Sequence, residues 1–130
     1  MIIDSHCHAG KGDGLTGPAD TNAPLEQYLP RARAAGIDRT VIFAALSTDY
    51  QRANRAIARM VRERPDRLMG FAFIHPIADR GRIASMAAEA AGPLGLLGLK
   101  VHRHDALVLD NKDARGRRPF RLCILTHQPA

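Results

Sequence analysis

The hydrophobic pattern along residues 1–101 changes repeatedly between two periods. Three runs, 40–44, 68–74 and 96–101, are almost continuously apolar and rich in β-branched, aromatic or leucine residues. Such runs are typical of parallel strands that are buried on both faces. A shorter apolar segment, Ile2 and Ile3, opens the chain and predicts a first strand that ends in the polar stretch DSHCH.

Segments with helical periodicity lie between these strands. Leu25, Leu29 and Ala32 recur at helical spacing before Gly36, which is a stop signal. They predict a first helix that Pro30 would kink or restart, because proline removes a backbone donor.

Two further helices are expected after the second and third strands. The second would be capped by Thr48 or Asp49 and stopped by Pro65, and the third would be capped by Asp79 and stopped by Gly92. The expected inward-facing positions are Ala53, Ile57, Met60 and Val61 in the second helix and Ile83, Met86 and Ala90 in the third. Strand and helix alternate at intervals of about 30 residues, the rhythm of βα units. The pattern therefore predicts an α/β fold with a parallel sheet.

The composition is that of a soluble globular protein, with 45% apolar and 25% charged residues. The first residues lack the basic region and apolar run of a secretion signal, and no apolar run approaches the length of a membrane span. Two cysteines, Cys7 and Cys123, are too few for a disulfide framework. These features predict a cytoplasmic protein with no membrane partner.

The net charge of +6 raises the question of an anionic partner such as a nucleic acid. Segment 110–121 contains five basic residues against two acidic ones, so about half of the surplus lies in one short stretch. That stretch has a single aromatic residue, whereas proteins that bind single strands stack bases on several. Arg52, Arg55, Arg59 and Arg62 recur at helical spacing and are expected to form a solvated helix face. No nucleic-acid partner is expected.

Candidate chemistry begins at the end of the first strand. Because side chains alternate along a strand, Asp4, His6 and His8 are expected on one face and Ser5 and Cys7 on the other. Functional groups gather at the carboxyl ends of parallel strands. Two converging imidazoles suit a catalytic Zn²⁺ or a related metal, which makes bound water a nucleophile near neutral pH. The alternative is a pair of surface histidines at a strand end.

The opening residues IIDSHCH resemble the first strand of the amidohydrolase superfamily, especially its amidohydrolase-related branch, which includes decarboxylases and hydratases. The resemblance continues through the sequences GID at 36–38, GFAFIHP at 70–76 and GLKVH at 98–102. It implies that residues 1–106 form the N-terminal half of a metal-dependent hydrolase barrel. Residues 107–130 would be a divergent basic tail that could include a remnant of strand five.

The resemblance also implies roles for single residues. His6 and His8 would bind a divalent metal, most simply Zn²⁺ with Mn²⁺ as the alternative, and a strand-five histidine and a strand-eight aspartate would complete the site. Lys100 and His102 share a face of the fourth strand and are predicted to act in catalysis, Lys100 by pairing an anionic group of a small-molecule substrate. For Lys100 the alternative is a side chain that snorkels at a sheet edge.

His127 is a candidate third metal ligand, because it ends an apolar run, 121–127, that could be the fifth strand. No helical pattern precedes this run. The alternative is that the tail after about Ala106 departs from the family and the match is fortuitous, and the missing helix slightly favours this alternative.

A TIM barrel has eight strands and typically about 250 residues, whereas four to five βα units are predicted here, so the fold is expected to be an incomplete (β/α)8 barrel. Open strand edges and an apolar inner face would favour a homo-oligomer or a second chain that completes the barrel. The chain is expected to be a fragment, the product of a truncated or frameshifted gene, or a half barrel completed by another subunit. The irregular tail favours truncation.

These observations predict a truncated metal-dependent hydrolase that acts on a small carboxylated or amide-like compound through a metal-activated water. Two alternatives remain. One is a decarboxylase or hydratase of the same branch, and the other is a non-catalytic remnant in which the motifs persist without a complete site.

Overall fold

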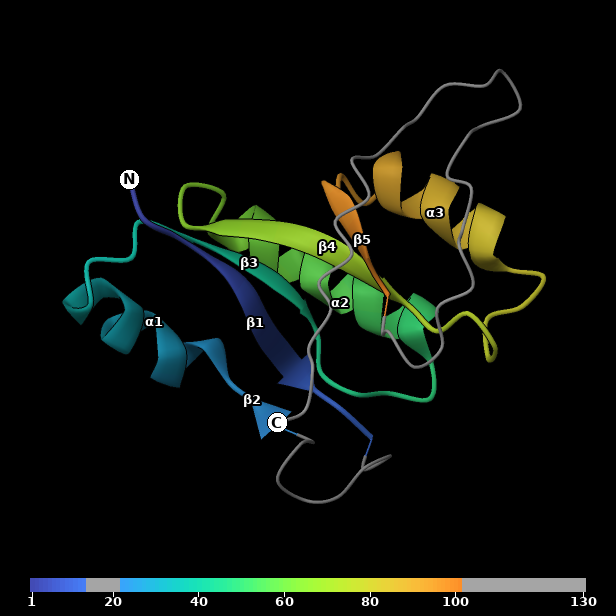
Figure 1. Ribbon diagram of the computed structural model, residues 1–130, viewed down its shortest axis with the longest axis horizontal. Coiled ribbons are helices and arrows are strands. Elements are labelled where there is room, and N and C mark those ends of the chain that lie inside the picture. The colour runs from blue at the N-terminus through green and yellow to red at the C-terminus, as the bar shows by residue number, and fades with distance from the viewer. Residues whose placement is uncertain (14–21, 102–130) are drawn as a thin grey trace.

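The computed structural model describes residues 1–13 and 22–101 of the chain, and Figure 1 shows how their helices and strands are arranged. In chain order the elements are β1 (Ile3–Lys11), β2 (Asn22–Ala23), α1 (Leu25–Ala34), β3 (Arg39–Ala44), α2 (Tyr50–Glu63), β4 (Leu68–Ile74), α3 (Ile83–Ala91) and β5 (Gly98–Val101). The predicted alternation of strand and helix is confirmed. The short strand β2 was not predicted.

The sheet has the strand order β2-β1-β3-β4-β5. Strands β1, β3, β4 and β5 run parallel and each lies beside the next one in the chain, while β2 pairs antiparallel with the end of β1. Sequential parallel order is the order found in a (β/α)8 barrel, whereas doubly wound folds reverse direction at a switch point. The predicted α/β class is therefore confirmed, and its strand order is that of part of a barrel.

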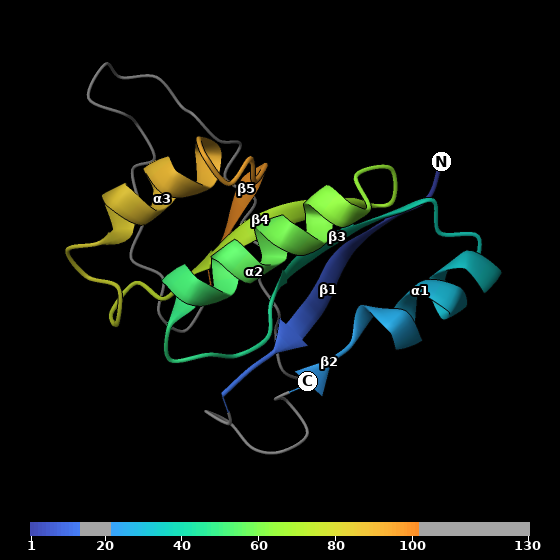
Figure 2. The same ribbon diagram turned by 180° about the vertical axis from the view of Figure 1, so that it is seen from behind.

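Helix α2 covers one face of β3 and β4, and Figure 2 shows this helix lying in front of the sheet. Its fully buried Ile57 faces Gly70 of β4, where a Cβ atom would lie 2.4 Å from Leu96 Cδ2 and 3.0 Å from Val61 Cγ2. Leu96 and the side chains of α2 thus pack so closely on this strand position that a glycine is favoured there. We call the face that carries Ile42, Gly70 and Ala72 the helix-covered face.

The helix ends follow the predicted signals in part. Asp49 caps α2 by accepting a hydrogen bond from the Arg52 backbone N–H at 3.0 Å, and the helix stops shortly before Pro65. Helix α1 begins after Pro24 and runs without interruption through Pro30, so no restart occurs there.

The predicted cap of α3 is wrong. Helix α3 starts at Ile83, whereas the buried Asp79 carboxylate accepts hydrogen bonds from the His75 backbone N–H at 2.9 Å and from Arg82 Nη2 at 2.8 Å. Asp79 closes the connection that follows β4, because its carboxylate satisfies a strand-end donor instead of a helix-end donor.

No helix within residues 1–13 and 22–101 is long and apolar enough to cross a membrane.

Candidate functional site

Strand β1 contains an irregularity that decides where its side chains point. Asp4 pairs with Thr40 of β3, but the next pair in register is Cys7 with Ile42, so three steps along β1 match two along β3. An extra residue of this kind is a β-bulge, which turns the side chains on one side of it to the other face. The prediction that Asp4 shares a face with His6 and His8 is therefore wrong.

The bulge places Asp4 on the α1 side of the sheet. Its Oδ2 atom accepts a hydrogen bond from the Tyr28 hydroxyl at 2.6 Å, and its Oδ1 atom accepts one from the His6 backbone N–H at 3.0 Å. The Tyr28 hydroxyl also lies 3.0 Å from Thr40 Oγ1. Asp4 therefore has a bonding role behind the strand and does not face the candidate site.

Cys7 lies on the same side as Ile42, its partner in β3, and is partly buried. Burial and the nearby Asp4 carboxylate raise the pKa of Cys7 to about 11. Because the thiolate is the metal-binding and nucleophilic form of cysteine, this thiol is protonated and inert near neutral pH.

His6 and His8 lie together on the opposite face, as predicted. Their ring centroids are 5.6 Å apart, and both rings pack edge-on against Phe43 of β3, at 4.9 Å and 4.7 Å. His8 is the register partner of Phe43, so the pairing of β1 with β3 builds this contact directly. The arrangement brings two imidazoles within reach of one point.

The hydrogen bond of His8 determines which of its ring nitrogens carries the proton. His8 Nδ1 lies 2.9 Å from the Ala44 carbonyl oxygen. A carbonyl oxygen only accepts hydrogen bonds, so Nδ1 must carry the proton, and in the neutral ring the lone pair is on Nε2. This is the arrangement by which proteins orient metal-binding histidines.

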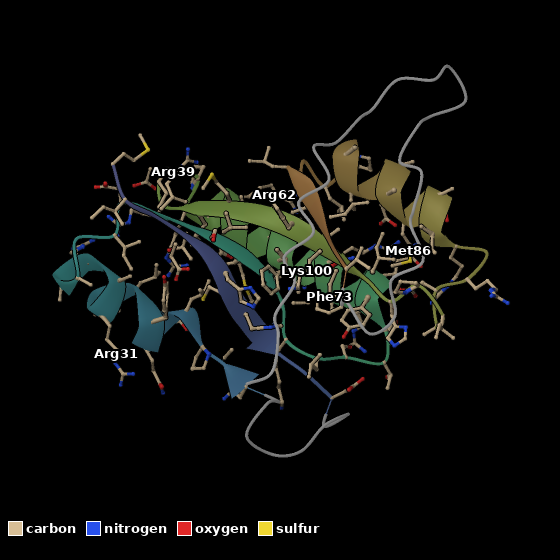
Figure 3. All side chains as sticks on the ribbon, in the orientation of Figure 1. Arg31, Arg39, Arg62, Phe73, Met86 and Lys100 are labelled. Carbon is tan, nitrogen blue, oxygen red and sulfur yellow. The ribbon has the colours of Figure 1, made fainter. Side chains whose placement is uncertain are left out.

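Lys100 of β5 and Phe73 of β4 lie on the same face as the histidines. They are register partners, and the Lys100 Nζ atom lies 5.1 Å from the centroid of the Phe43 ring. Lys100 is only 2% exposed, and the aromatic ring offers its ammonium group a favourable cation–π contact. Figure 3 shows Lys100 and Phe73 side by side near the centre of the sheet. We call the face that carries His6, His8, Phe43, Phe73 and Lys100 the histidine face.

The sequence pattern did not identify two residues that support the histidine face from α2. Asn54 is 3% exposed, and its side chain donates to the Phe73 carbonyl oxygen at 2.9 Å and accepts from the Phe73 N–H at 2.8 Å. Tyr50 stacks on the Phe73 ring, with centroids 4.3 Å apart. The available signal was a polar residue, Asn54, on the apolar stripe that contains Ile57 and Ala58.

Beyond the carboxyl ends of the strands, hydrogen bonds join two loops. Asp13, in the glycine-rich segment after β1, accepts hydrogen bonds from the backbone N–H of Thr48 at 2.7 Å and from the Thr48 hydroxyl. Thr48 lies between β3 and α2. The segment after β1 is thereby tied to the rim near the histidine face.

His75 follows β4 and takes part in its turn. Its Nδ1 atom accepts a hydrogen bond from the Ala78 backbone N–H at 3.2 Å. The ring therefore helps to shape the connection between β4 and α3.

The chemistry of the donor set fits a divalent metal in part. Two imidazoles on one face, one of them oriented through Nδ1, are suitable ligands. Within the described ranges, no group of three or more histidine, cysteine, aspartate or glutamate residues could hold a metal ion. The predicted site residues His102 and His127 lie outside those ranges, so their position relative to the pair is not described.

Comparison with known proteins extends this picture. No protein-family model matches the chain, and no curated protein matches it by sequence. Several solved structures match its fold. The 5-carboxyvanillate decarboxylase LigW from Sphingomonas paucimobilis aligns with a TM-score of 0.62 and 17% identity over 78% of this chain and 42% of that structure. These structures are amidohydrolase-superfamily proteins.

Two more neighbours support the same fold. The 2,6-dihydroxybenzoate decarboxylase from Rhizobium aligns with a TM-score of 0.61 and 18% identity over 92% of this chain and 42% of its own. A probable 2-pyrone-4,6-dicarboxylic acid hydrolase from Acinetobacter baumannii, with citric acid bound, aligns with a TM-score of 0.53 and 17% identity over 85% of this chain and 40% of its own. The resemblance inferred from the first strand is thereby confirmed at the level of fold, and the chain spans less than half the length of each of these barrels.

Proposed function

We propose that this chain carries the first metal-binding strand and part of the substrate pocket of an amidohydrolase-type enzyme. The observation that supports this most directly is the pair of imidazoles on the histidine face, with His8 held as the Nδ1–H tautomer by the Ala44 carbonyl group. Because the chain spans about 42% of the neighbouring barrels, the activity of the whole enzyme is part of the proposal.

His6 and His8 are the residues that would hold the metal, which we propose to be Zn²⁺, with Mn²⁺ as the alternative. A divalent cation acts there as a Lewis acid and makes water a better nucleophile near neutral pH. The chain itself fixes the tautomer of His8 and packs both rings against Phe43, which restricts their rotation. His127 is the proposed third ligand and His102 a further site residue.

Lys100 is the proposed binding group for a substrate carboxylate. Its ammonium group lies on the histidine face above the Phe43 ring, and Phe73 is its neighbour in the sheet. Phe43, Phe73 and Lys100 are each 0 to 2% exposed, so the proposed carboxylate would pair with a largely desolvated ammonium group beside two phenyl rings. The three named neighbours include two decarboxylases and a probable hydrolase, each named for a carboxylated compound.

The proposed reaction is metal-assisted hydrolysis of such a compound, and a decarboxylase or hydratase is the alternative. Two of the three neighbours named above are decarboxylases, which favours giving this alternative equal weight in any assay. A homo-oligomer or a second chain would supply the remaining strands of the barrel. A non-catalytic remnant is the remaining alternative, and it predicts no turnover even with metal bound.

A metal titration tests the proposal. Metal-free protein is titrated with Zn²⁺ by calorimetry and with Co²⁺ by visible spectroscopy. The His6→Ala and His8→Ala variants are expected to bind at least about a hundredfold more weakly, since loss of an outer-shell partner alone reduces metal affinity ten- to a hundredfold.

His75→Ala is the matched control, because this histidine also follows a strand but bonds to the backbone of its own turn. Its metal affinity should equal that of the unmodified protein. Unmodified protein that takes up no metal, or histidine-face variants that bind as tightly as the control, would contradict the proposal.

A further inference from the structure

The bulge in β1 lies between two anchors that hold the strand in opposite orientations. On its amino-terminal side, Asp4 faces α1 and bonds to Tyr28. On its carboxyl-terminal side, His8 faces the opposite way and bonds to the Ala44 carbonyl oxygen. His6 lies between these anchors, so its direction depends on the bulge staying where it is.

We propose that Tyr28, acting through Asp4, is a positioning residue that holds the bulge and thereby keeps His6 on the same face as His8. Neither Tyr28 nor Asp4 touches the candidate metal position, because both lie on the α1 side of the sheet. The inference rests on the proposed function only for its consequence, metal affinity, whereas the structural part stands on the hydrogen bonds of the chain alone.

A chain of hydrogen bonds carries this argument. The Asp4 carboxylate can only accept, so the Tyr28 hydroxyl donates to Oδ2 at 2.6 Å. The Thr40 hydroxyl, 3.0 Å away, is then free to donate to the Tyr28 oxygen. At the other carboxylate oxygen, Asp4 accepts the His6 backbone N–H at 3.0 Å. Helix α1 is thus connected through two side chains to the backbone of the proposed ligand.

The Tyr28 hydroxyl keeps its proton and so remains a hydrogen-bond donor. Burial and the hydrogen bond to Asp4 raise the pKa of Tyr28 to about 12. The hydroxyl therefore keeps its proton throughout the range in which the protein would work, and the direction of the hydrogen bond does not change with pH.

The bulge matters because side chains repeat every two residues along a strand. If the pairing of Asp4 with Thr40 continued without the extra residue, His6 and His8 would turn toward α1 and away from Phe43 and Lys100. If instead the pairing of His8 with Phe43 extended backwards, Asp4 would turn onto the histidine face and lose Tyr28. Only the bulged register both keeps the Asp4–Tyr28 hydrogen bond and places His8 on the histidine face.

Amide hydrogen exchange and Co²⁺ binding test this role in three variants. Tyr28→Phe removes only the hydroxyl, Asp4→Asn keeps an acceptor oxygen for the His6 N–H, and Asp4→Ala removes the acceptor. We expect the His6 amide of metal-free Tyr28→Phe to exchange about tenfold faster, and its Co²⁺ affinity to fall about tenfold, as for lost supporting partners of ligands. Asp4→Asn should retain most of the affinity and Asp4→Ala should lose it.

Asp38→Asn is the matched control. Asp38 also accepts a backbone N–H, that of Ile2 at 2.6 Å, but lies at the amino-terminal end of the sheet. This control should leave both measurements unchanged. Because Asp4→Ala could unfold, the milder Tyr28→Phe variant and circular dichroism keep the comparison valid.

Two results would overturn the positioning role. One is an unchanged exchange rate of the His6 amide in Tyr28→Phe. The other is an Asp4→Asn variant that loses as much Co²⁺ affinity as Asp4→Ala, which would show that the charge of Asp4 acts and its geometry does not. If unmodified protein and Asp38→Asn bind no Co²⁺, the proposed function fails, and the exchange rates alone still decide the positioning role.

Discussion

The two faces of the sheet differ in chemistry although the same strands build both. On the helix-covered face, Ile42, Ala72 and Ile57 of α2 are each 0 to 1% exposed and pack as aliphatic side chains. On the histidine face, the alternate positions carry two imidazoles, two phenyl rings and the ammonium group of Lys100. Hydrophobic burial explains this aliphatic packing.

Burial explains the two phenyl rings of the histidine face, but it does not explain the imidazoles and the ammonium group. A charged group in the interior costs free energy to desolvate even when it has partners, whereas a methionine of similar size would not. Buried ionisable groups are concentrated at functional sites. The comparison therefore predicts that substitutions of the aliphatic residues on the helix-covered face change stability and leave binding alone, and that substitutions of the imidazoles and of Lys100 on the histidine face change binding more than stability.

The largest effect on stability is expected for Ile57→Ala. This side chain is 1% exposed between α2 and β4, so its loss leaves a cavity and should lower the free energy of unfolding by about 3 kcal/mol. Chemical denaturation measures the change. Ile77→Ala is the control, because Ile77 is 63% exposed and its truncation should have almost no effect. Altered Co²⁺ affinity in a folded Ile57→Ala protein would show that the aliphatic residues of the helix-covered face also affect metal binding.

Lys100→Met should change binding more than stability. The variant keeps an apolar side chain of similar volume and loses the cation–π contact with Phe43, so the free energy of unfolding is expected to change by no more than about 2 kcal/mol. The affinity for a simple aromatic carboxylate such as benzoate should fall at least about tenfold, because a desolvated charge partner is lost.

Calorimetry with benzoate and denaturation of the same protein separate these two quantities. Lys11→Met is the matched control, since Lys11 is an exposed lysine at the end of β1. A large loss of stability in Lys100→Met without a loss of benzoate binding would mean that Lys100 is a structural residue.

The smallest effect is expected for an ion pair that lies on neither face. Arg55 Nε lies 2.6 Å from Glu89 Oε1, and Gln51 donates to the same carboxylate at 2.8 Å. Hydrogen bonds from Arg55 and Gln51 hold the pKa of Glu89 below its ordinary value of 4.5. A depressed carboxylate pKa stabilises the fold above the ordinary pKa, and this contribution is lost as the pH falls below 4.5.

Glu89→Gln should therefore weaken the dependence of stability on pH below 4.5 and change little at neutral pH, since exposed pairs are screened by solvent. Denaturation at a series of pH values measures this. Glu63→Gln, at a more exposed pair with Arg64, is the control and should leave the dependence intact. If Glu89→Gln and Glu63→Gln gave the same dependence of stability on pH, the Arg55–Glu89 pair would have no role in that dependence.

Several elements could be predicted from sequence because their signals are local. The apolar run of β4 was placed at 68–74, which the structure confirms, and the Asp49 cap and the end of α2 before Pro65 followed from helix chemistry. His6 and His8 lie on one face, as alternation predicts, although the bulge between Asp4 and Cys7 turns Asp4 to the other face, and Lys100 lies on the same side as the two histidines.

Other features could not be predicted from a local pattern. Asp79 was expected to cap α3 but bonds to the backbone of His75, four residues before it, because the turn after β4 brings that donor to the carboxylate. Asn54 was not recognised as a supporting residue, since its bonds with the Phe73 backbone exist only when α2 packs beside β4. A polar residue on an apolar helix stripe indicates that its side chain has a buried hydrogen-bond partner, but it does not identify that partner.

The sequence by itself determined the order of strands and helices and the residue types available for chemistry, because periodicity and capping act over a few neighbouring positions. The tertiary structure decided which face each residue of β1 occupies. Asp4 turns toward α1 because Tyr28 offers a hydroxyl there, and His8 turns the other way because the Ala44 carbonyl oxygen meets its ring. Two opposing anchors from different parts of the chain create the bulge between them, and no local pattern in β1 contains either anchor.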